Sequence, residues 1–147
     1  HMVEIGEKSE TARYARARAV VSLAPTTLEE LKANRLAKGD ALAVVRITAI
    51  QAAKATSNTI PLCHPIRLTS VDVDVLLHDE PARVEILATV HVLDRTGPEM
   101  EAMAAATSGA LALYDMCKSI DRAMTIHSVV LLEKSGGKSG HWHRDDA

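Results

Sequence analysis

The sequence predicts a single α+β domain in which an antiparallel sheet carries helices on one face. Three observations predict it. Four segments have the residue pattern of strands with one buried face. Residues 102–114 carry no charge, which is typical of a helix buried in a core. The chain has 147 residues, enough for one hydrophobic core but not for two.

The first strand is expected at 13–23. Arg16 and Arg18 fall on one face of this segment, and alanine and valine fall on the other. Alternating alanine and arginine is also compatible with a helix, so a helical assignment remains open here.

Two helices are expected next. Thr27 as N-cap and Glu30 three residues later form a capping box, which predicts a helix to about residue 37. Asp40 ends a turn and is expected to cap a second helix at 41–56.

The remaining elements follow in order. Strands are expected at 66–77 and 84–92, joined by a hairpin turn at 79–82. The uncharged helix begins at Pro98, a favoured first helical residue, and a last strand covers 124–132. The order βα(α)ββαβ is that of a ferredoxin-like sandwich. Such a sheet leaves one face open, and a chain of this size cannot easily bury an all-apolar helix, so we expect a homo-oligomer.

Charges return where the uncharged helix ends. Asp115 and Lys118 are three residues apart and share one face. Removing both charges from water costs several kcal/mol per ion unless they are well paired, which favours a functional role. The alternative is an ordinary ion pair worth about 0–1 kcal/mol, with Glu99, Glu101 and Lys118 offsetting the helix dipole. Asp115 opposes that dipole, and this favours function.

Composition limits the classes of partner. The net charge is −2 and aromatic residues make up 2% of the chain. Nucleic-acid modules normally present a basic face or stacking aromatic side chains, so we expect no nucleic-acid partner. We find no signal peptide, membrane span or lipidation motif and expect no membrane partner.

Two distant cysteines indicate a reducing, cytoplasmic setting. The glycine-rich tail at 136–147 is expected to be flexible, which leaves 1–135 as the domain.

Two further segments are candidates for chemistry. The prolines around Cys63 and His64 restrict the backbone, so His64 is presented rather than packed; the alternative is a rigid turn. Adjacent ligands cannot readily share one ion, and we predict no metal site. Residues 134–140 contain Gly-Lys-Ser, but Leu132 stands where a phosphate-binding loop needs glycine. Lys134 either closes over phosphates or belongs to a solvated tail.

Taken together, these residues resemble the MoaC family of cyclic pyranopterin monophosphate synthases. No single segment is diagnostic, but they occur in the family's order over nearly the whole chain. Pro98 departs from the β-branched residue common there. The matching segments are 2–3, 38–40, 50–54, 60–65, 97–101, 114–118 and 134–140.

The resemblance implies an activity and a set of site residues. The substrate would be a 3′,8-cyclised dihydroguanosine triphosphate, converted to cyclic pyranopterin monophosphate with release of pyrophosphate and no cofactor. The family's catalytic positions match Asp115, Lys118 and Lys38. The substrate-binding positions match Arg13, Leu62, Cys63, His64, Glu99, Met100, Glu101 and Lys134. The resemblance also implies a hexamer, a trimer of dimers with sites at subunit interfaces.

Helix geometry adds a constraint of its own. Asp115 follows Glu101 by fourteen residues, about 21 Å along a helix that rises about 1.5 Å per residue. This is longer than is comfortable for one small-nucleotide pocket. If both ends act on one substrate, they must come from different subunits, so we expect a site shared at a subunit interface. The main alternative is a non-catalytic oligomer that binds nucleotides or acts as a sensor; a metal hydrolase comes third.

Overall fold

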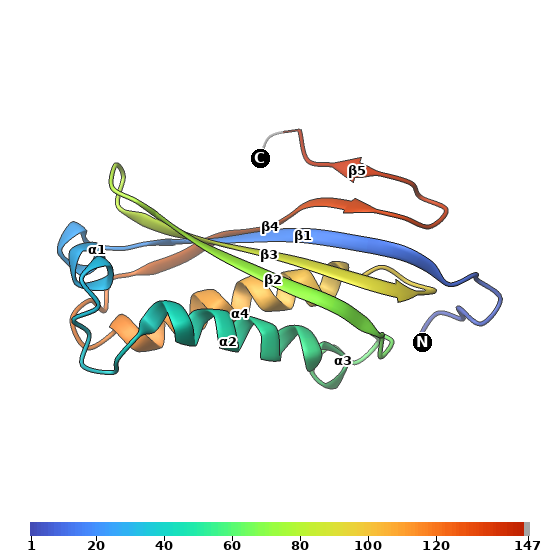
Figure 1. Cartoon of the computed structure of the whole chain (residues 1–147), viewed down its shortest axis with the longest axis horizontal. Coiled ribbons are helices and arrows are strands. Elements are labelled where there is room, and N and C mark those ends of the chain that lie inside the picture. Colours follow the sequence, from blue (N-terminus) through green and yellow to red (C-terminus); the bar gives the residue numbers. More distant parts are fainter. Residues whose placement is uncertain (146–147) are drawn as a thin grey trace.

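The computed structural model describes residues 1–145. Its sheet is five-stranded and antiparallel, in the order β2-β3-β1-β4-β5, and α2 and α4 lie together on one face (Figure 1). The strands are β1 Thr11–Ser22, β2 Leu68–His78, β3 Arg83–Asp94, β4 Thr125–Ser135 and β5 Trp142–His143. The helices are α1 Pro25–Lys32, α2 Ala41–Lys54, α3 Thr56–Thr59 and α4 Glu99–Cys117. The α+β, ferredoxin-like prediction is confirmed.

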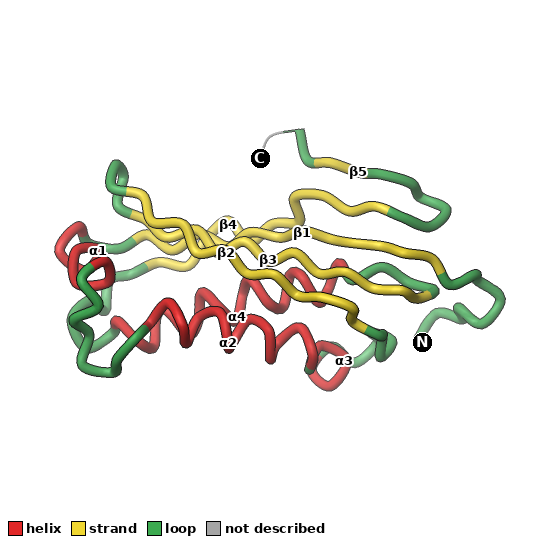
Figure 2. The backbone as a smooth tube through the Cα atoms, in the orientation of Figure 1, coloured by secondary structure: helices red, strands yellow, loops and turns green. Residues whose placement is uncertain are grey.

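The core lies between the sheet and the two long helices. The side of β1 that faces them carries Ala15, Ala17, Ala19 and Val21, all fully buried. Such small side chains let the helices approach closely. A Cβ added at Gly109 of α4 would lie 3.1 Å from the Ile86 side chain, so this position accepts little more than glycine. Figure 2 shows the other face of the sheet without helices.

The first helix differs from its prediction. It begins at Pro25 and ends at Lys32, and no side chain of its own caps it. Thr27 lies inside the first turn and is buried, so the predicted capping box is wrong. A carboxylate from a distant segment, Asp121, accepts hydrogen bonds there instead. In contrast, the prediction that Asp40 caps the next helix is confirmed, because its Oδ1 accepts from the Ala43 backbone N–H at 2.9 Å.

The prediction that the uncharged helix is buried on all sides is wrong for the single chain. α4 buries one broad face but exposes Met100, Thr107 and Leu111, the last to 63%. On the same side of the sheet, α2 exposes Val44 and Ile47. The lack of charged residues at 102–114 correctly indicated that the surface of α4 is apolar, but it did not show which part of that surface is covered.

The segment after β4 contains a strand that the residue pattern does not predict. β5 pairs with β4, placing Trp142 opposite Lys134 and His143 opposite Glu133. None of the helices in the described part of the chain combines the length and the hydropathy needed to cross a bilayer.

Candidate active site

A carboxylate between two ammonium groups lies at the C-terminal end of α4. Asp115 Oδ2 accepts a hydrogen bond from Lys38 Nζ at 2.5 Å, and Asp115 Oδ1 lies 2.7 Å from Lys118 Nζ. Lys38 also donates to the Asp115 carbonyl at 2.8 Å. The hydrogen bonds from Lys118 and Lys38 lower the pKa of Asp115 to about 2. We call these three residues the lysine–aspartate cluster; its acid is ionised at neutral pH.

The sequence led us to expect that the charges of this cluster are removed from water. The structure contradicts that prediction. The Asp115 side chain is 54% exposed and both lysine side chains are similarly open. The cluster therefore faces solvent in the single chain. Its oriented charges are therefore accessible to a ligand or to a second subunit.

A cavity lies at the opposite, N-terminal end of α4. It measures about 410 Å³, and we call it the Glu101 cavity. Its lining brings together two segments that the sequence singled out separately. They supply Leu62, Cys63, His64, Glu99, Met100 and Glu101. The turn before β2 and the first turn of α4 thus form one pocket with both apolar and ionisable walls.

Glu101 is the most perturbed group in this cavity. It is only 4% exposed, and burial, with a smaller contribution from Glu99, raises its pKa to about 7. Burial, followed by the charge of Glu101, also raises the pKa of Cys63. A carboxyl group that titrates near neutral pH can both donate and accept a proton, which suits general acid–base chemistry.

Cations line the approach to the cavity. Lys134 Nζ lies 3.1 Å from a Glu99 carboxylate oxygen and donates to the Ser139 hydroxyl at 2.7 Å. Arg13 donates from Nε to the Asp94 carbonyl at 3.1 Å. Arg13 also lines a neighbouring open cavity of about 710 Å³ together with Lys138. Such a basic rim suits an anionic ligand.

The N-terminal segment is a wall that the sequence analysis missed. Val3, Ile5 and Lys8 line the Glu101 cavity, and Lys8 also lines the neighbouring one. Arg95 holds this segment by donating to the Gly6 carbonyl at 2.8 Å. The family resemblance includes residues 2–3 and so Val3, but no local pattern signals the attachment of the segment, because it comes from a side chain 89 positions away.

The predicted site residues therefore form two groups, one at each end of α4. In Figure 1 the helix starts near the α3 end of the molecule and finishes near α1. Glu101 and Asp115 both belong to α4, so the expected distance between them along the helix holds. Within residues 1–145, no three His, Cys, Asp or Glu side chains are grouped closely enough to hold a metal ion.

The similarity to known proteins extends over both groups of predicted site residues. A sequence model of the MoaC family matches residues 2–137. A relative from Thermomicrobium roseum, named cyclic pyranopterin monophosphate synthase, is 52% identical over 145 residues. The match covers 99% of this chain and 87% of that relative. The similarity thus extends over the whole fold and not only over isolated motifs.

Proposed function

The chain belongs to the MoaC family, and we propose that it is a cyclic pyranopterin monophosphate synthase. The reaction converts 3′,8-cyclo-7,8-dihydroguanosine 5′-triphosphate to cyclic pyranopterin monophosphate, releases pyrophosphate and serves molybdenum cofactor biosynthesis. The observation that carries the proposal is the 52% identity over nearly the full chain.

The lysine–aspartate cluster supplies the catalytic groups of this proposal. Asp115, with a pKa of about 2, is a weak base at neutral pH. Its main effect is to hold the ammonium groups of Lys38 and Lys118 in a fixed orientation. Lys118 is then the proton donor, and Asp115 receives protons only when a bound substrate draws the lysines away.

The Glu101 cavity binds the pterin part of the substrate. Two carboxylates, Glu99 and Glu101, suit the N1–H and amino edge of guanine, which are hydrogen-bond donors. Leu62, Cys63 and Met100 provide apolar contact. His64 with the nearby cations Arg13 and Lys134 suits the triphosphate, which carries several negative charges.

We further propose that each site is shared between two subunits of a homo-oligomer, a hexamer built as a trimer of dimers. The support is the separation of about 21 Å along α4 together with the exposed apolar side chains of α2 and α4, Ile47 and Leu111 among them. An antiparallel pairing of two α4 helices brings the lysine–aspartate cluster of one subunit to the partner's Glu101 cavity. A cytoplasmic location fits because Cys63 and Cys117 are both free thiols.

The direct test is turnover of the cyclised nucleotide, followed by pyrophosphate release and by chromatography of the pterin product. Binding without turnover contradicts the proposal and favours a non-catalytic nucleotide-binding oligomer.

A second experiment tests the shared site. Subunits carrying Asp115→Ala are mixed with subunits carrying Glu101→Ala under conditions where subunit exchange is verified by mass. An oligomer made of either variant alone is expected to be inactive. Mixed oligomers should regain part of the activity, because some interfaces then hold one intact site. Absence of recovery despite verified exchange contradicts sharing.

A further inference from the structure

We propose that Asp121 is a positioning residue for the lysine–aspartate cluster. It acts on the two backbone segments that carry Lys38 and Lys118, without contacting the substrate. Its effect on turnover rests on the proposed function, whereas its effect on the two segments does not.

Asp121 lies in the turn after α4 and is 9% exposed. Its carboxylate accepts three hydrogen bonds. Oδ2 accepts from the Ala24 backbone N–H at 2.9 Å and from the Thr27 hydroxyl at 3.2 Å, and Oδ1 accepts from the Ala123 backbone N–H at 3.1 Å. One side chain thus joins the turn after α4 to the start of α1, more than ninety positions earlier.

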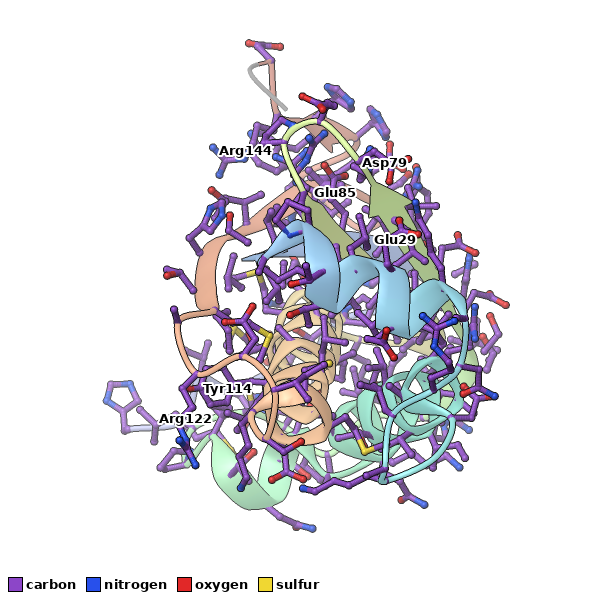
Figure 3. The ribbon with its side chains drawn as sticks, turned by 90° about the vertical axis from the view of Figure 1, so that its left-hand side faces the viewer. Glu29, Asp79, Glu85, Tyr114, Arg122 and Arg144 are labelled. Atoms are coloured by element: carbon purple, nitrogen blue, oxygen red, sulfur yellow. The ribbon has the colours of Figure 1, made fainter. Side chains whose placement is uncertain are left out.

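The turn that carries Lys118 is closed against the end of α4. The Lys118 N–H donates to the Tyr114 carbonyl at 2.9 Å, and the Asp121 N–H donates to the Cys117 carbonyl at 3.0 Å. The Tyr114 hydroxyl donates to the Arg122 carbonyl at 3.1 Å. Figure 3 views this end of the molecule and shows Tyr114 and Arg122 near each other, with α1 in front.

The segment that carries Lys38 continues from α1. Its anchor is Leu36, a buried residue whose carbonyl accepts from the Gly39 N–H at 3.0 Å. Lys38 then reaches Asp115 from a position 77 residues earlier in the chain. The two lysines therefore approach Asp115 from two segments, and Asp121 joins those segments through α1.

The charge of Asp121 suits this position. α1 has Ala24 as N-cap and no capping side chain of its own, so the carboxylate satisfies an otherwise free N–H and is favoured by the helix dipole. Asparagine has only one acceptor oxygen. It cannot reproduce the bonds of both Oδ1 and Oδ2, so a partly buried backbone N–H loses its carboxylate partner.

A shift of these segments changes the cluster more than the Glu101 cavity, which lies at the other end of α4. A displacement of about 1 Å at a reacting group can lower the rate about a hundredfold. We therefore expect Asp121→Asn to lower kcat about 10- to 100-fold with little change in KM. The matched control is Asp72→Asn, an exposed aspartate on β2, which should retain the parent kcat and KM.

Two milder variants, at Thr27, allow the proposal to be tested even if Asp121→Asn does not fold. Thr27→Val removes one of the three hydrogen bonds at nearly constant volume, and Thr27→Ser keeps the hydroxyl. Thr27→Val should lower kcat a few-fold, and Thr27→Ser should restore it.

Hydrogen–deuterium exchange provides a measurement that needs no activity. In Asp121→Asn or Thr27→Val, amide exchange should increase at 118–123 and also at 36–40, whereas the segment 60–66 should keep the parent rate. Faster exchange confined to 118–123, or an unchanged kcat in an active enzyme, overturns the proposal. If the parent chain shows no turnover, the proposed function fails, and the exchange at 36–40 alone decides whether Asp121 positions the cluster.

Discussion

The two ends of α4 carry the same kind of group in opposite states. At the C-terminal end, Asp115 is open to solvent and bound by two ammonium groups, so its pKa falls to about 2. At the N-terminal end, Glu101 is buried beside another acid, and its pKa rises to about 7. Two carboxyl groups on one helix are therefore set apart by burial and by the charge of their neighbours. One holds charge constantly, and the other can exchange a proton near neutral pH.

The largest effect is expected from Asp115→Asn. The neutral amide no longer balances Lys38 and Lys118, so the two ammonium groups repel each other and lose their orientation. Turnover should fall about 10²–10⁴-fold, while binding of the substrate, measured by calorimetry, is retained. Full activity in this variant would refute the catalytic role of the cluster.

The next effect concerns the surface between the two ends. Leu111 is the most exposed apolar side chain of α4, and Leu111→Arg places a charge where subunits are proposed to meet. Analytical ultracentrifugation should show smaller oligomers, and most of the turnover should be lost. Thr107→Ser, a conservative change at a nearby exposed position, should alter neither. An unchanged oligomer would place the interface elsewhere.

Glu101→Gln tests the buried end through the pH dependence of stability. Because the pKa of Glu101 is raised from 4.5 to about 7, the folded state binds more protons than the unfolded state between these pH values. The stabilisation by neutral Glu101 is complete below its unfolded pKa and is lost as the pH rises toward its folded pKa.

The free energy of unfolding of the parent chain should therefore drop, relative to Glu101→Gln, by about 3 kcal/mol between about pH 4 and pH 8. Chemical denaturation at several pH values measures this difference. Parallel curves for the two proteins would show that Glu101 is not shifted.

The smallest effect is expected at the rim of the Glu101 cavity. Lys134→Met removes an ammonium group that lies 3.1 Å from Glu99, and KM should rise roughly tenfold, with little change in kcat. The increase should shrink at high salt because rim charges are screened. Lys32→Met, which removes a lysine at the α1 end paired with Asp79, serves as the control and should leave KM unchanged.

Local features were predictable where the physical signal is local. Strand alternation has a period of two, so the order of residues alone assigns Arg16 and Ala17 to opposite faces of β1. Asp40 lies next to the helix that it caps, so its role was readable from neighbouring residues. The capping box at Thr27 failed because a nonlocal carboxylate, Asp121, occupies that helix start.

The order of the elements, the apolar character of α4 and the spacing of its charges could be read from the chain, because these depend on neighbouring residues. The open face of α4, the contact of Lys38 with Asp115 and the raised pKa of Glu101 became known from the folded structure. Burial and long-range pairing depend on how distant segments pack, and no local pattern of residues records that packing.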